Sequence, residues 1–146
     1  MGNIIKNTNK NSEVTYVHSS YNNGQIREEI WYLNGVKHTD YDAPAHISYY
    51  ENGNVYIKIW YKNGKMHRDN YEPAFIVYYD DGVEKEKKWY KNGKFHRNDG
   101  LPDFVVYHDN GMEKYKYWYQ NDKEYRYNDL PVFTEYDNKG NTIKEL

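Results

Sequence analysis

The sequence contains no cysteine, has very little leucine and has no long apolar run. Without cysteine, neither a disulfide framework nor a zinc site with thiolate ligands is available. No apolar stretch approaches the roughly 20 residues that a membrane-spanning helix requires. The net charge is only −2, which argues against a protein that binds nucleic acid mainly through phosphate contacts. We therefore expect a soluble protein with no nucleic-acid partner and at most a peripheral contact with membranes.

Aromatic residues take the place of the missing aliphatic ones. The 146 residues include 19 tyrosines and 4 tryptophans, although the mean hydropathy is −1.21. The length is that of one domain. A polar chain with many rings and few leucines favours a thin structure whose core is a layer of aromatic side chains.

A repeat of 29 residues organises the chain. Four residue types share this spacing without an insertion: Trp31, Trp60, Trp89 and Trp118; Pro44, Pro73, Pro102 and Pro131; Gly24, Gly53, Gly82, Gly111 and Gly140; Tyr49, Tyr78, Tyr107 and Tyr136. Residues 14–146 are therefore predicted to be about four and a half copies of one unit. Residues 1–13 match no part of it, and their polar composition predicts a disordered tail. Because they also lack the apolar segment of a secretory signal, we expect a cytoplasmic protein.

The local signals within each unit are those of β-structure. Asn-Gly occurs twice in the second copy, at 52–53 and 63–64, and both pairs predict two-residue type I′ turns. The residues between these turns are rich in β-branched and aromatic types. No segment has apolar residues at helical spacing. The predicted fold class is all-β, an elongated antiparallel meander of hairpins.

Alternation along the strands separates a recurrent face from a variable one. The predicted turn pairs Ile47 with Lys58 and Tyr49 with Tyr56. The recurrent face then carries Ala45, Ile47, Tyr49, Trp60 and His67, and we expect it to be the packed side. The opposite face differs between copies and is the expected surface for solvent or a partner. Its candidate binding residues are Ile57, Ile59, Tyr115 and Tyr117.

The unit resembles the MORN repeat. The resemblance rests on residues 56–67 and 78–82, which read YIKIWYKNGKMH and YYDDG, and it covers residues 21–146. The usual unit is about six residues shorter, and a glycine after the histidine is replaced here by arginine and a proline-containing insert. This longer variety is similar to repeats of giant DNA viruses, which implies a viral protein of the host cytoplasm or virion. The resemblance implies an elongated sheet used for protein–protein contact or self-association, and lipid binding is also attributed to the family.

Two recurring polar positions invite a chemical interpretation. His38, His67 and His96 recur at one place, which raises a metal or acid–base role. Tyr125 occupies this position in the fourth copy, which favours ring packing over metal binding. Arg68, Arg97 and Arg126 follow, each with a nearby acid, namely Asp69, Asp99 and Asp129. A feature built three times indicates architecture, so we expect charge pairs that fix a kinked loop.

No catalytic pattern is present in the sequence. It contains no phosphate-binding loop, no H-E-x-x-H zinc motif and no nucleophile–base arrangement. The chain is therefore predicted to be a non-enzymatic interaction or scaffold module without cofactor or metal, which self-associates as a homodimer. The main alternative is a carbohydrate or cell-wall-binding module, because such repeats also combine Trp-Tyr with Asn-Gly. Exposed tryptophans would favour that alternative, and buried ones would favour a core role.

Overall fold

The computed structural model describes residues 3–9, 12–97, 100–120, 122–124 and 131–146. Within them the only regular elements are β-strands, which confirms the predicted all-β class. Among the described residues there is no helix with the length and apolar character needed to cross a membrane.

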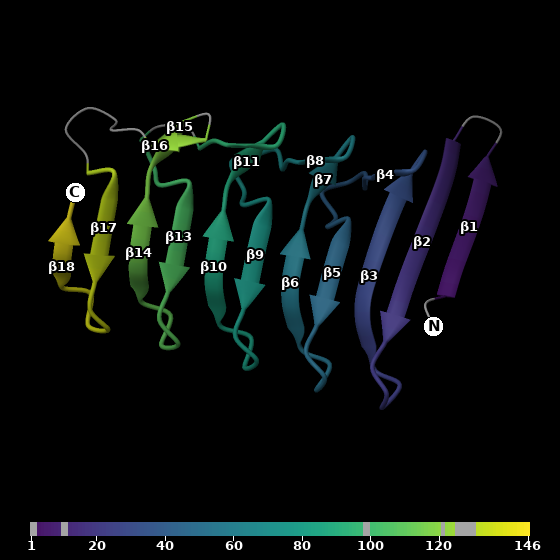
Figure 1. Cartoon of the computed structure of the whole chain (residues 1–146), viewed down its shortest axis with the longest axis horizontal. Helices are drawn as coiled ribbons and strands as arrows, with labels where there is room; N and C mark the ends of the chain where they lie inside the picture. Colours follow the sequence, from purple (N-terminus) through teal and green to yellow (C-terminus); the bar gives the residue numbers. More distant parts are fainter. Residues whose placement is uncertain (1–2, 10–11, 98–99, 121, 125–130) are drawn as a thin grey trace.

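Most strands form one large antiparallel sheet of 12 strands. Its members lie side by side in a single layer, with the two ends of the chain at opposite ends of the sheet (Figure 1). Each strand pairs with the next sheet member in the sequence, from β1 at one edge to β18 at the other, and β4 adds to β3. The strands of this sheet are β1 (Asn3–Asn9), β2 (Ser12–Ser20), β3 (Ile26–Leu33), β4 (Val36–Lys37), β5 (His46–Tyr49), β6 (Val55–Ile59), β9 (Phe75–Tyr78), β10 (Glu84–Lys88), β13 (Phe104–Tyr107), β14 (Glu113–Tyr117), β17 (Phe133–Tyr136) and β18 (Thr142–Glu145).

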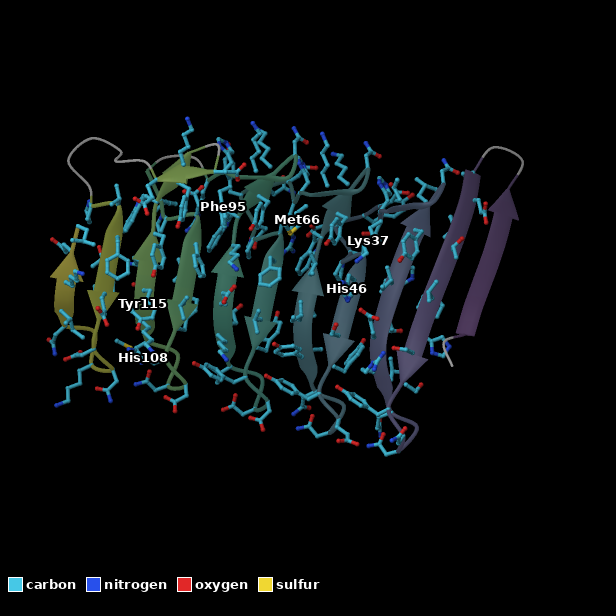
Figure 2. The ribbon with its side chains drawn as sticks, viewed as in Figure 1. Lys37, His46, Met66, Phe95, His108 and Tyr115 are labelled. Carbon is cyan, nitrogen blue, oxygen red and sulfur yellow. The ribbon has the colours of Figure 1, made fainter. Side chains whose placement is uncertain are left out.

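Three small hairpins follow the long ones along one end of the strands (Figure 1). They are β7–β8 (Tyr61–Lys62 and Lys65–Met66), β11–β12 (Tyr90–Lys91 and Lys94–Phe95) and β15–β16 (Tyr119–Gln120 and Lys123–Glu124). Lys37, Met66 and Phe95, which are 29 residues apart, lie along this end, whereas His108 lies at the opposite end (Figure 2). Backbone bonds join neighbouring hairpins, from Gly64 N to Lys37 O at 3.0 Å and from Gly93 N to Met66 O at 2.8 Å.

The two Asn-Gly turns of a unit have different conformations. Asn63 and Gly64 both have positive φ, 52° and 76°, which confirms the type I′ turn predicted there. The prediction for residues 52–53 is wrong, because of this pair only Gly53 has positive φ. Tyr50 O instead accepts a bond from Gly53 N, and Tyr50 N donates to Asn54 O. This loop is one residue longer, which is typical of a type I turn closed by a glycine bulge.

The longer loop changes the register near the turn. Ile47 pairs with Lys58 as predicted, but Tyr49 pairs with Val55 instead of Tyr56. The shift recurs in the three later long hairpins. Because it falls beside the turn, it leaves the assignment of faces in the strand interior unchanged.

The chain before residue 14 differs from the predicted disordered tail. Strand β1 pairs along its whole length with β2, from Asn3 opposite His18 to Asn9 opposite Ser12. The polar composition misled the prediction because strand pairing uses backbone groups, which every one of these residues carries. The sheet therefore begins at β1, before the repeated units.

The recurrent face is the packed face, as predicted. The buried side chains on it include Ala45, Trp60, Ala74, Ile76, Trp89, Val105 and Trp118. Lysines from the same face lie over the tyrosine of the next unit, with Lys58 Nζ 5.6 Å from the Tyr78 ring centroid and Lys87 Nζ 5.5 Å from that of Tyr107. The variable face is also partly packed, because Ile59 and Val77 are buried. It is not simply a solvent face.

Candidate functional site

Each tryptophan from the second copy onward is held by the loop that precedes it. Trp60 Nε1 donates to Asp42 O at 2.9 Å, Trp89 Nε1 to Tyr71 O at 2.8 Å, and Trp118 Nε1 to Gly100 O at 2.8 Å. The accepting residues of all three loops have left-handed backbones, with φ of 58°, 60° and 69°. The ring is thus packed within the fold and its indole N–H has a hydrogen-bond acceptor, which is what a core tryptophan requires.

Trp31 precedes the first of these loops and packs on Tyr16, with 5.2 Å between ring centroids. The recurring prolines lie in the loops. Pro73 and Pro102 are buried, whereas Pro44 and Pro131 are half-buried. Their positions agree with the predicted break between units.

The recurring histidines join one unit to the next. Nδ1 of His38 accepts the backbone N–H of Asn63 at 3.1 Å, and Nδ1 of His67 accepts that of Asn92 at 3.1 Å. An acceptor role for Nδ1 assigns the ring proton to Nε2, which bonds Asp69 Oδ1 at 2.9 Å in the second copy. Bonds from His67 and Lys62 hold the pKa of the Asp69 carboxyl below its usual value. Both ring nitrogens of His67 therefore form hydrogen bonds within the fold.

The recurring arginines pair differently from the prediction. Arg68 does not pair with Asp69 but with Asp42 of the preceding loop, through Nε–Oδ1 at 2.7 Å and Nη2–Oδ2 at 2.9 Å. Its guanidinium carbon also lies 4.0 Å from the Trp60 ring centroid. The Arg68 bond holds the pKa of Asp42 below its usual value. Sequence proximity misled the prediction, because the loop folds back over the tryptophan and brings a more distant acid closer.

Several predicted positions lie outside the described residues. They are Asp99, Tyr125, Arg126 and Asp129. His96 lies at the same place as the other histidines, because its backbone N–H donates to Trp89 O at 3.1 Å, as those of His38 and His67 donate to Trp31 O and Trp60 O.

Two pockets form where these loops meet the tryptophans. One, of about 350 Å³, lies beside Trp60 and is bordered by His38, Asp42 and Arg68. The other, of about 550 Å³, lies beside Trp89 and is bordered by Tyr71 and Arg97. We call it the Trp89 pocket. Within the described part of the chain, no group of three or more His, Asp or Glu side chains could hold a metal ion.

An aromatic stripe crosses the variable face. Register places its members opposite one another from β6 to β17, namely Ile59, Phe75, Lys88, Phe104, Tyr117 and Phe133. Lys88 Nζ lies 4.8 Å from the Phe75 ring centroid and 4.6 Å from that of Phe104, so the cation bridges two rings. Tyr117 stacks on Phe104 at 5.1 Å. The stripe is therefore continuous in spite of its charged member.

The predicted binding residues fall on this face in two groups. Ile57 and Ile59 lie on β6, and Tyr115 and Tyr117 lie on β14. Three strands separate β6 from β14, which corresponds to about 20 Å at the usual strand spacing. Ile59 and Tyr117 belong to the stripe, and the other two lie in the adjacent row. They do not form one compact site.

A buried carboxyl escaped the sequence prediction. Asp103 is 2% exposed and occupies the position of Ala45 and Ala74 in the earlier units. Its Oδ2 accepts the Tyr119 N–H at 2.8 Å, while Oδ1 has no partner. Burial raises the pKa of this carboxyl to about 6. Aligning the units and noting an acid in an alanine column would have revealed it.

Comparison of the chain with models of known protein families, with curated proteins and with solved structures gave no match. The resemblance to the MORN repeat therefore stays a prediction from the sequence.

Proposed function

We propose that this chain is a non-enzymatic protein-interaction module of MORN-like repeats, which self-associates through the aromatic stripe. The observation that carries the proposal is the stripe itself. It is a continuous row of large side chains on one face of a single-layer sheet, and the same antiparallel hairpin pairing recurs beneath it.

The distribution of polar groups supports a non-enzymatic role. A catalytic interpretation would rest on the recurring histidines, the tryptophans and Arg68. Two of the histidines, three of the tryptophans and Arg68 instead form hydrogen bonds to a neighbouring unit or to the loop that precedes them. A side chain committed to such contacts is poorly available to a substrate. The stripe on the variable face consists of apolar and aromatic side chains with one lysine, and aromatic residues are enriched in protein–protein interfaces.

The carbohydrate alternative draws less support from the geometry. Trp60, Trp89 and Trp118 are between 6 and 8% exposed, so their faces do not form an open platform for sugars. The lipid alternative also draws less support, because an overall charge of −2 gives little attraction to anionic lipid.

The test is sedimentation velocity of the whole chain at concentrations on the order of 100 µM, a range in which weak dimers are populated. We expect a concentration-dependent dimer. Tyr117→Ser should shift it towards monomer, because this side chain stacks on Phe104 and packs at a tilt against Phe133 within the stripe. The matched control is Tyr41→Ser, since Tyr41 is fully exposed on a loop away from the stripe.

Circular dichroism of each variant reports whether the sheet is retained. A monomer at every concentration would contradict self-association, and equal effects of the two substitutions would contradict the stripe as its surface.

A further inference from the structure

The second unit shows how the fold binds a carboxylate. The guanidinium of Arg68 lies over the Trp60 ring, and its Nη1 donates to Pro73 O at 3.3 Å. Its remaining edge, Nε and Nη2, takes both oxygens of Asp42. This is the two-pronged geometry by which arginine recognises carboxylates most strongly. Asp42 comes from the preceding loop, so here the chain supplies its own ligand.

The third unit has the same arginine without the acid. Arg97 lies on Trp89 with its guanidinium carbon 3.8 Å from the ring centroid, and Nη1 donates to Pro102 O at 3.1 Å. The stacking and the proline bond therefore orient this guanidinium as they orient Arg68. The residue equivalent to Asp42 is Tyr71, whose side chain is 68% exposed. Tyr71 offers no carboxylate to the arginine.

The Nε–H group of Arg97 is unsatisfied. Its Nε is buried and has no hydrogen-bond partner, which is a costly state for part of a charged group. Burial accordingly lowers the pKa of the guanidinium. Among the acids around it, Asp69 bonds His67 and Lys62. Buried Asp103 interacts electrostatically with Arg97, but its Oδ1 and the Arg97 Nε both have no hydrogen-bond partner. Glu72 lies 3.9 Å from Arg68 Nη1. Among the described residues none forms an ion pair with Arg97.

We propose that the Trp89 pocket binds the carboxylate of an aspartate or glutamate side chain from a partner segment, on the Nε–Nη2 edge of Arg97. The incoming group takes the place that Asp42 fills in the second unit. The pocket of about 550 Å³ is larger than its counterpart beside Trp60, so it admits the residues next to the acid as well. This proposal extends the interaction role proposed above, but it does not depend on the aromatic stripe or on self-association.

The probe is a capped peptide with the sequence of residues 42–45, Asp-Ala-Pro-Ala, which is the segment that supplies the acid in the second unit. Its control has asparagine in place of aspartate. The readout is the proton and nitrogen resonance of Arg97 Nε–H and of the Trp89 indole N–H in the whole chain. Arg68 Nε–H is an internal reference, because it already carries a carboxylate.

We expect the aspartate peptide to move the Arg97 Nε–H resonance downfield, towards that of Arg68, along a saturable curve. The Arg68 resonance should not move, and the asparagine peptide should have no saturable effect. Tyr71→Asp should shift Arg97 Nε–H in the same direction without any peptide and should abolish peptide binding. Aspartate suits the backbone there, because Asp42 has φ of 58° and Tyr71 has φ of 60°.

Three results would overturn the proposal. One is that the aspartate peptide causes no saturable shift in the wild-type chain, although Tyr71→Asp does move the Arg97 Nε–H resonance towards that of Arg68. Another is an equal response to both peptides, or a response that survives Arg97→Gln. The third is acetate saturating the site at the same concentration as the peptide, which would assign the pocket to small free carboxylates instead of a partner segment. Because the readout is local to the pocket, its failure leaves the sedimentation result unaffected.

Discussion

Replacing Asp103 by asparagine should make the protein more stable at neutral and alkaline pH, and by much less in acid. The side chain is almost completely buried, and only one of its two carboxylate oxygens has a partner. Asparagine keeps the shape and an oxygen acceptor for the Tyr119 N–H while removing the charge. The substitution therefore reports the net free energy of burying an ionised carboxyl, including its attraction to the nearby Arg97.

The magnitude follows from the pKa. Burial raises the pKa of Asp103 from 3.8 to about 6, and each unit corresponds to about 1.4 kcal/mol. A carboxyl whose pKa is higher in the folded state contributes its full stabilisation below the unfolded value and loses it as the pH rises through the folded value. At about pH 8 the free energy of unfolding of the wild-type chain should therefore be lower than that of Asp103→Asn by up to about 3 kcal/mol.

The assay is urea unfolding followed by tryptophan fluorescence at about pH 4 and about pH 8. The control is Asp109→Asn, which makes the same change of charge on an exposed turn residue and should leave the free energy of unfolding within about 0.5 kcal/mol of wild type. A gain from Asp103→Asn that is equal at both pH values would refute the reasoning, because a titration must depend on pH. A loss at about pH 8 would show that the charge is stabilising where it lies.

The remaining predictions concern the rings. Trp60→Ala should lower the free energy of unfolding by about 3–5 kcal/mol, because this side chain is 7% exposed and its indole N–H is bonded. Urea unfolding measures the loss, and Tyr41→Ala, at a fully exposed ring, is the control that should change little. The protein should also lose stability above about pH 10, because burial raises the pKa of Tyr16 and of Tyr90 to about 12. For such groups the stabilisation is complete below the unfolded value and disappears as the pH rises through the folded one. Circular dichroism together with tyrosinate absorbance across this range should show the two changes together, whereas tyrosines that ionise without any loss of structure would contradict the prediction.

The sequence was sufficient to predict the sheet and the packed face because both follow from regular spacings of residues along the chain. A 29-residue spacing of tryptophan, glycine and proline, combined with alternation along each strand, places Trp60 and Ile76 on one side without knowledge of the tertiary structure. The turn at residues 52–53 was predicted wrongly because Asn-Gly is compatible with two loop lengths. The backbone hydrogen bonds beside the turn decide between the two loop lengths, and these bonds cannot be read from the residue types.

The partners of charged side chains were the least predictable part. Arg68 follows Asp42 by 26 residues, and only the fold of the intervening loop brings them together. The differences between units were nevertheless legible in the sequence. Tyrosine at 71 where 42 is aspartate, and aspartate at 103 where 45 and 74 are alanine, both mark places where one copy departs from the others. In a repeat protein such departures are the positions to examine first.

The bonds between neighbouring units have a consequence for copy number. Each internal unit presents a histidine nitrogen and a carbonyl group to the next unit, and it binds the same two groups of the unit before it. The bonds of His38 and His67 are examples. An in-frame gain or loss of 29 residues therefore joins surfaces that already fit, wherever the breakpoint falls within the unit. Unequal recombination between the copies would lengthen or shorten the sheet without inventing a new junction, so array length is free to vary in evolution while the contacts stay the same.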